Sequence, residues 1–201
     1  MLKQIIAILT TQIELLRLAV ANYRRTPPQP PRLVELTPET AEWEIIIPGG
    51  EQPRFMSVRQ IPNADVRPDH FVVMVDADAF YRTWLQCSQP GKPERLRRPR
   101  ECVTRAKMPA DRKYAQAMDG FSRGFDNPVP LANCSVYHEG KRVVIDIGDG
   151  ATRTIWLLAN RASSFPIEVH GRRPAELLHK VAGIGSAPLS FAELFHHAAP
   201  A

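Results

Sequence analysis

The chain has 201 residues, of which 44% are hydrophobic, and a formal net charge of +5. This length and apolar content suit one domain with a sizeable core and exclude an intrinsically disordered chain. The basic balance is compatible with a polyanionic partner, although many soluble proteins share it. The three cysteines are not at C-x-x-C spacing and the six histidines form no H-E-x-x-H pattern, so we expect neither a disulfide framework nor a zinc site.

Residues 2–25 predict an amphipathic helix, because apolar residues recur at steps of three and four: Leu2, Ile5, Ile6, Leu9, Ile13, Leu16, Val20 and Tyr23. The proline-rich segment 26–31 ends this helix. The helix either packs on the main body or docks a partner or a second copy of the chain. We therefore expect an N-terminal helix with its linker over residues 1–31 and a single domain over residues 32–201.

The N-terminal segment predicts neither a signal peptide nor a membrane span. Polar residues such as Gln4, Glu14 and Arg17 interrupt the apolar run, no small-residue cleavage site follows, and no stretch of about 18 apolar residues occurs. We therefore expect a cytoplasmic protein without membrane insertion, which reaches the inner face of the membrane only if a partner recruits it.

The next segment predicts a strand pair and then a buried strand that leads into a helix. Residues 43–47 and 55–61 form two strand candidates around the turn Pro48-Gly49-Gly50. Residues 71–75 are a continuous apolar run of strand length, which is typical of a central strand. Asp76 or Asp78 can then cap a helix.

Residues 92–113 are the most basic part of the sequence, with nine basic and three acidic side chains. This segment is either a solvated loop or an arm that contacts phosphates. The candidates for DNA contact are Arg95, Arg97, Arg98, Arg100, Arg105 and Lys107.

The C-terminal half predicts regular α+β structure. In chain order we expect a strand over 128–137, a turn over 138–141, a strand over 142–147, a tight turn over 148–150, a helix over 151–161, a strand over 166–169, a helix that begins near Pro174 and ends at Gly183, and a capping box from Ser190 to Glu193. The connection at residues 148–153 is a strand, a glycine turn and a helix with Arg153 in its first turn. It is either an ordinary connection with an exposed arginine or a site where backbone N–H groups, the Thr152 hydroxyl and Arg153 bind an anion.

Four motifs carry a family resemblance: Gly120-Phe-Ser-x-Gly124, Asn127-Pro-Val-Pro-Leu-Ala132, Asp149-Gly-x-x-Arg-Thr-Ile-Trp-Leu157-Leu158 and Phe165-Pro-Ile-Glu-Val169. Their order resembles the core of the ParB/sulfiredoxin superfamily, and more closely the plasmid fertility-inhibition factors of the oncogenic-suppression type. The resemblance implies an α+β fold with a ParB/sulfiredoxin-like core, that is, a small mixed sheet flanked by helices, with the N-terminal helix added.

The resemblance also implies a function. Such factors block DNA transfer through a foreign type IV secretion or conjugation system, and the superfamily core implies binding of a nucleotide such as ATP, with nucleotide hydrolysis or DNA cleavage in some members. Carried over by position, Gly150, Thr152 and Arg153 would meet the triphosphate, and Asp149 would hold Mg²⁺ or a water. Ser122, Arg123 and Gly124 could reach the same pocket.

Two further readings of the family resemblance stay open. A non-enzymatic inhibitor would bind the secretion coupling protein or its DNA substrate, and a nucleotide-sensing regulator would bind DNA without cutting it. Sulfinic-acid reduction is disfavoured, because Ala151 and Thr152 stand where sulfiredoxins carry cysteine and histidine before the motif arginine, and Cys134 is more easily explained as a core residue. The residues do not predict the oligomeric state.

Overall fold

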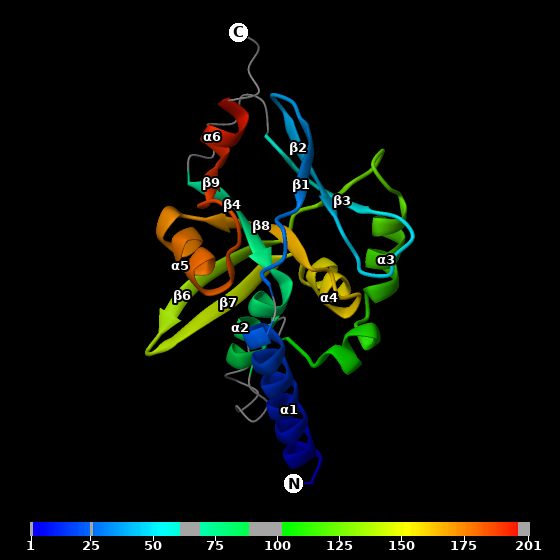
Figure 1. Cartoon of the computed structure of the whole chain (residues 1–201), viewed down its shortest axis with the longest axis vertical. Helices are drawn as coiled ribbons and strands as arrows, with labels where there is room; N and C mark the ends of the chain where they lie inside the picture. Colours follow the sequence, from blue (N-terminus) through cyan, green and yellow to red (C-terminus); the bar gives the residue numbers. More distant parts are fainter. Residues whose placement is uncertain (1, 25, 61–68, 89–101, 197–201) are drawn as a thin grey trace.

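The computed structural model describes residues 2–24, 26–60, 69–88 and 102–196 (Figure 1). The first sheet has the order β1-β2-β3-β5 and consists of β1 (Arg32–Leu36), β2 (Thr40–Ile45), β3 (Arg54–Arg59) and β5 (Val129–Pro130). The second has the order β7-β6-β8-β4-β9 and consists of β7 (Arg142–Asp149), β6 (Asn133–Glu139), β8 (Ser164–His170), β4 (His70–Asp76) and β9 (Leu189–Ser190). Both sheets combine parallel and antiparallel pairs, so the predicted α+β class is confirmed, with two small mixed sheets rather than one.

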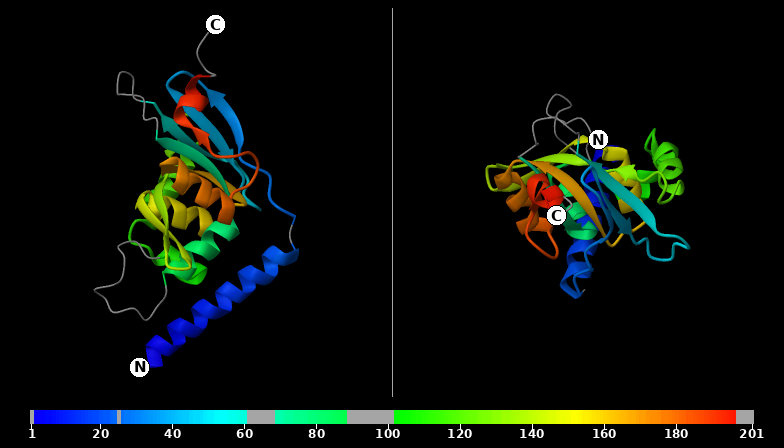
Figure 2. Two further views of the ribbon diagram at one scale, coloured as in Figure 1. Left: turned by 90° about the vertical axis from the view of Figure 1, so that its left-hand side faces the viewer. Right: turned by 90° about the horizontal axis from the view of Figure 1, so that it is seen from above.

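Helices surround these sheets, and the N-terminal helix lies at one end of the molecule (Figures 1 and 2). Their bounds are α1 (Leu2–Arg24), α2 (Ala77–Cys87), the 3-10 helix η2 (Arg105–Ala110), α3 (Tyr114–Ser122), α4 (Ala151–Ala159), α5 (Arg172–Ala182) and α6 (Phe191–His196). The core is built from aromatic and branched residues such as Phe80, Trp84, Phe165 and Ile167, all at most 1% exposed. Large buried side chains from helix and strand thus hold the second sheet against α2.

Several local predictions are confirmed. The 43–47 and 55–61 candidates overlap β2 and β3, which pair antiparallel around the 48–50 turn; residue 61 lies outside the described residues. The Asp76 side chain caps α2 by accepting hydrogen bonds from the N–H groups of Asp78 and Ala79. Ser190 and Glu193 form the capping box of α6, with side-chain to backbone bonds in both directions.

The predicted strand over residues 128–137 is wrong, because the chain there belongs to two sheets. Val129–Pro130 is β5 of the first sheet, and Asn133–Glu139 is β6 of the second. Between them, the Leu131 N–H donates to Ser57 O on β3, and Ala132 O accepts from the Glu168 N–H on β8. The two residues between β5 and β6 therefore carry the chain from one sheet to the other.

Other boundaries also differ from the predictions. Gly148 and Asp149 continue β7, since Asp149 pairs with Asn133 across a bulge, so the tight turn contracts to Gly150. Pro174 is the third residue of α5, which begins at Arg172. The elements β1, η2, α3 and β9 were not predicted.

Helix α1 confirms the predicted helix over residues 2–24, with residue 25 outside the described residues, and it leans against α2 as a long rod at one end of the molecule (Figure 2). Thr11 and Leu18 are buried against the body, and the Tyr81 hydroxyl donates to the Glu14 carboxylate at 3.2 Å. The linker is tied to the body as well, because the Ser164 hydroxyl donates to Gln29 O at 2.8 Å. By length and composition alone, Leu2–Ala21 is apolar enough to cross a membrane, a test that soluble core helices and leader sequences also pass.

Candidate functional site

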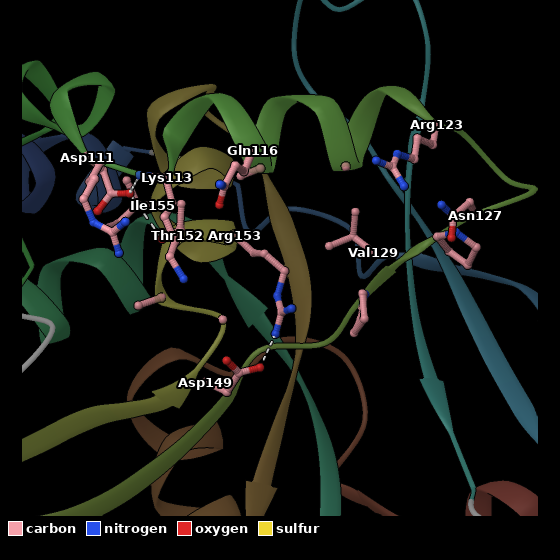
Figure 3. Close-up of a pocket in the computed structure, with 17 residues that line it drawn as sticks. Asp111, Lys113, Gln116, Arg123, Asn127, Val129, Asp149, Thr152, Arg153 and Ile155 are labelled. Atoms are coloured by element: carbon pink, nitrogen blue, oxygen red, sulfur yellow. Dashed lines mark hydrogen bonds and ion pairs between the residues drawn. The ribbon is translucent and has the colours of Figure 1, made fainter.

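A cavity lies between α3 and the first turn of α4 (Figure 3). Its volume is about 640 Å³, within the range of small-molecule sites. Backbone and side chains of the Asn127–Pro130 segment close one side of it. The ionisable side chains that line it are four basic ones and two acidic ones: Arg112, Lys113, Arg123, Arg153, Asp111 and Asp149. We call this cavity the turn pocket.

Gly150 forms the corner of the turn pocket and cannot be replaced without strain. Its φ of +81° lies in the left-handed region that favours glycine. A Cβ there would lie 2.6 Å from the Ala132 Cβ and 2.7 Å from Nη2 of Arg153. Gly150 also has no side chain with which to cap α4, so it supplies no side-chain acceptor for the N–H groups of the first turn. Uncapped N–H groups at the positive end of a helix favour an anion.

Arg153 lies at the centre of the pocket (Figure 3). Its Nη2 donates to the Asp149 carboxylate at 2.6 Å and to Leu131 O at 3.3 Å. The Arg153 side chain is 21% exposed and the Asp149 side chain 68% exposed. Among the described residues, the buried Nε of Arg153 has no hydrogen-bond partner. The guanidinium thus has donor capacity left beyond the ion pair.

Thr152 and Asp111 join α4 to the start of α3. The Thr152 hydroxyl donates to the Asp111 carboxylate at 3.2 Å, and that carboxylate also accepts from the Lys113 N–H at 2.9 Å. The Thr152 hydroxyl is therefore already engaged, and it can turn to a ligand only by leaving Asp111. Asp111 had not been singled out from the sequence as a site residue.

Ser122, Arg123 and Gly124 were predicted to reach the same pocket as Arg153. Of these three, Arg123 lines the turn pocket, whereas Ser122 and Gly124 are not among its lining residues. Arg123 is half exposed and pairs with Asp119 one helical turn earlier at 2.7 Å. The Ser122 hydroxyl donates to Asp119 O. Gly124 has a φ of +70°, which explains the glycine as a turn residue after α3.

The predicted DNA-binding arm divides into three parts. Arg95, Arg97, Arg98 and Arg100 lie outside the described residues. Lys107 is exposed on η2. Arg105 is held within the fold: its Nη2 donates to the Asp78 carboxylate at 2.6 Å, its Nε to Leu158 O at 2.9 Å, and its guanidinium stacks over the Tyr81 ring at 4.9 Å. These bonds give Arg105 a structural role and argue against a phosphate contact there.

Arg112, Lys113, Gln116 and Asn127 line the pocket without having been singled out as site residues. The first two belong to the basic segment 92–113, and this concentration of positive charge was the signal in the sequence. A second cavity of about 580 Å³ lies between α1, α2 and the β6–β7 hairpin. Its ionisable lining residues besides Cys87 are all basic: Arg82, Lys141, Arg142 and Lys180.

Two of the three cysteines, Cys102 and Cys134, are buried in the core. Cys134 is buried on β6, and burial, together with the nearby Asp146 and Glu168 carboxylates, raises the pKa of its thiol. Burial likewise raises the pKa of Cys102. Because the thiolate is the reactive form, these two residues are inert core residues, as the sequence suggested for Cys134.

Within the described part of the chain, no group of three or more His, Cys, Asp and Glu side chains is arranged to hold a metal ion. The turn pocket does contain two carboxylates, Asp111 and Asp149. Mg²⁺ is commonly held by one or two carboxylates together with phosphate oxygens and water. The residues present fit Mg²⁺ only if a phosphate ligand supplies the remaining oxygens.

Comparison with known proteins identifies the family. A family model described as the plasmid fertility inhibition factor matches residues 72–183. Protein Osa of Shigella flexneri is 29% identical over 164 residues, which cover 82% of this chain and 79% of the relative. The crystal structure of an oncogenic suppression activity protein, a plasmid fertility inhibition factor studied as a gold(I) cyanide derivative, is 27% identical and superposes with a TM-score of 0.79 over 96% of each chain. The family model spans more than half of the sequence, and its match includes β7, Gly150 and α4. The chain belongs to the plasmid fertility inhibition factor family.

Proposed function

We propose that this fertility inhibition factor binds a nucleoside triphosphate such as ATP in the turn pocket and uses the site to block DNA transfer through a foreign type IV secretion or conjugation system. The observation that carries the proposal is that four basic side chains line one pocket together with the first turn of α4, which has no side-chain cap from Gly150. Gly150 lets a ligand approach the backbone closely at this corner. Such a corner supplies both the oriented N–H groups and the positive charge that phosphate oxygens bind.

The distribution of charge favours a polyphosphate over a single phosphate. Lys113 precedes α3 and Arg123 follows it, so the two are separated by roughly 15 Å of helix at 1.5 Å per residue. Arg153 lies between them in the pocket (Figure 3). A chain of linked phosphates, in a nucleotide or along a DNA strand, would contact several of these cations at once. Transferred DNA is thus the second ligand that we assign to this surface.

Asp149 supplies the acidic group that phosphate-ester hydrolysis requires. It lies beside Arg153 and is largely exposed, so solvent reaches its carboxylate. Asp149 would hold Mg²⁺, and that cation would offset phosphate charge in nucleotide hydrolysis and in metal-assisted DNA cleavage. Arg153 would be freed from Asp149 to bind phosphate oxygens, and its unpartnered Nε gives it a further donor for this purpose.

A non-enzymatic inhibitor is the alternative, and one observation favours it. Arg153 and Asp149 form a 2.6 Å ion pair one helical turn apart, an arrangement that also stabilises the start of a helix. In that case the pocket is a structural remnant, and inhibition comes from binding the coupling protein or its DNA substrate. The cytoplasmic face of the membrane is where we place either activity, through recruitment by the secretion apparatus.

A plasmid-nicking assay tests the enzymatic proposal. Purified protein is incubated with supercoiled plasmid, with and without Mg²⁺ and ATP, beside Asp149→Ala, Arg153→Ala and the control Asp126→Ala, whose residue does not line the pocket. We expect metal-dependent nicking that the first two variants lose and the control retains. The same variants are then tested for inhibition of plasmid transfer in cells. Absence of nicking, with transfer still blocked by folded Asp149→Ala and Arg153→Ala, would establish the non-enzymatic alternative.

A further inference from the structure

The side of α1 that faces away from the body presents a continuous apolar stripe. Its seven residues are between 51% and 91% exposed: Leu2, Ile6, Leu9, Ile13, Leu16, Val20 and Tyr23. Scattered single apolar residues are common on protein surfaces, but a contiguous stripe along 23 residues of helix marks an interaction surface. We call these seven residues the α1 seam.

Successive seam residues are separated by alternating steps of four and three, without interruption through three heptads. Ile6, Ile13 and Val20 therefore occupy position a, and Leu2, Leu9, Leu16 and Tyr23 occupy position d. All three residues at a are β-branched, and all but the last at d are leucine. β-Branched residues at a with leucine at d are the combination that favours a parallel coiled coil of two strands.

The body binds the opposite side of the same helix, so it does not compete for the seam. The buried residues Thr11 and Leu18 both fall at position f, directly opposite the a and d positions. Glu14, at b, accepts the hydrogen bond from Tyr81. Figure 2 shows α1 as a rod that meets the body along one side only. The helix can therefore stay docked on its own body while the seam receives a second helix.

The repeat period identifies the kind of partner. A straight α-helix has 3.6 residues per turn, so a stripe with a period of 3.5 drifts by roughly 20° per heptad. A flat membrane surface would favour an apolar stripe that follows the straight helix. Such a surface also does not distinguish β-branched residues from leucine. A second helix that supercoils around the first keeps a 3.5-residue stripe in contact over its whole length. We propose that α1 pairs with α1 of a second copy of this chain as a parallel two-stranded coiled coil.

The flanking charges select the parallel orientation. Positions e carry Lys3, Thr10 and Arg17, and positions g carry Ile5, Gln12 and Ala19. In a parallel pair e faces g of the partner helix, which places Arg17 opposite Gln12. In an antiparallel pair e faces e, and the basic side chains of both helices line the same edge, where like charges repel. The dimer would thus hold two turn pockets related by the two-fold axis of the coiled coil.

Size-exclusion chromatography with light scattering on the full chain tests the proposal. We expect a mass of two chains, that is, twice 22.6 kDa. Leu16→Glu, at d, should reduce the mass to one chain. The matched control Ile8→Glu adds the same charge to an exposed isoleucine of the same helix at position c, off the seam, and should remain a dimer. A wild-type mass of one chain overturns the proposal, as does a Leu16→Glu protein that remains a dimer.

Two further measurements test whether the two α1 helices are parallel and whether the seam binds a membrane. Leu2→Cys in a Cys87→Ser background should form an intermolecular disulfide under mild oxidation, because a parallel pair brings the two N-terminal ends together. Failure to crosslink in a protein that is dimeric overturns the parallel arrangement.

Sedimentation with vesicles of phosphatidylcholine and phosphatidylglycerol tests a membrane as the alternative partner of the seam. A wild-type monomer whose vesicle binding is lost in Leu16→Glu and retained in Ile8→Glu would show that the seam is a membrane-docking face instead.

Discussion

The substitution Gly150→Ala tests how the turn pocket is built. It adds a single methyl group at the N-cap of α4, where the backbone φ is +81°. That methyl would lie 2.6 Å from the Ala132 Cβ and 2.7 Å from the Ala132 Cα, closer than real contacts allow, and the second of these atoms is backbone. Either α4 or the β5–β6 connection must therefore move to admit it.

The expected decrease in the free energy of unfolding has two parts. An L-residue other than glycine in the left-handed region costs about 1–2 kcal/mol. Overpacking a close contact costs about 1–3 kcal/mol more. Gly140→Ala is the matched control, because Gly140 has a φ of +61° and its added Cβ would meet nothing within 4 Å. We expect Gly140→Ala to show the backbone cost alone and Gly150→Ala to show both.

Urea unfolding of the wild type and both variants measures these costs through the free energy of unfolding. Phosphate or ATP binding, measured on the folded variants, then reports on the pocket. We expect Gly150→Ala to weaken binding, since the same methyl also lies 2.7 Å from Nη2 of Arg153, and Gly140→Ala to leave it unchanged. If Gly150→Ala is no less stable than Gly140→Ala, the close packing of this corner is refuted.

Two further predictions concern charges inside the fold. Burial and the neighbouring Glu35 raise the pKa of Glu42 above its ordinary value of 4.5. The wild type should therefore lose stability relative to Glu42→Gln as the pH rises above this value. Thermal unfolding of both proteins at pH 4 and pH 7.5 measures this loss, which should reach up to about 1 kcal/mol and be present only at the higher pH. Arg105→Met removes the 2.6 Å ion pair with Asp78 and should cost about 2–3 kcal/mol, somewhat less than loss of a fully buried pair because both side chains retain some exposure. DNA affinity of the folded Arg105→Met protein should match that of the wild type, and a selective loss of DNA binding without loss of stability would restore Arg105 as a phosphate contact.

Local patterns predicted the elements whose determinants lie close together in the sequence. The apolar run 71–75 and the cap at Asp76 define β4 and the start of α2, and both are confirmed. The capping box from Ser190 to Glu193 needs only residues three apart, and it too is confirmed. In such segments the preferred backbone conformation and the tertiary fold agree.

Pairings between distant segments were not predictable in the same way. Residues 128–137 form one extended apolar stretch, and its division depends on Ser57 of β3 and Glu168 of β8, which bind the chain on either side of the break. The role of Arg105 depends on Asp78, 27 residues earlier. Short runs such as β1 and β9 gain their strand structure from a neighbouring strand rather than from their own pattern.

The candidate site was predictable in part. The Asp149–Arg153 turn was identified from its glycine and arginine, and the structure places Gly150, Thr152 and Arg153 on one cavity with Arg123. The contribution of Asp111, Arg112 and Lys113 arises because α3 packs against α4, and no local pattern shows which helices pack together. Nucleotide, metal and DNA binding at this cavity stay predictions.

Isothermal titration of ATP into the purified full chain in the presence of Mg²⁺ tests whether the turn pocket binds a nucleoside triphosphate through Arg153. Loss of charge-assisted hydrogen bonds of about 1.5–3 kcal/mol should weaken ATP binding by roughly 10- to 100-fold in Arg153→Ala. The control Arg59→Ala, whose residue is exposed on β3 and does not line the cavity, should bind as the wild type does. Equal ATP affinity in the wild type and a folded Arg153→Ala protein, or no binding by the wild type at all, would contradict the account.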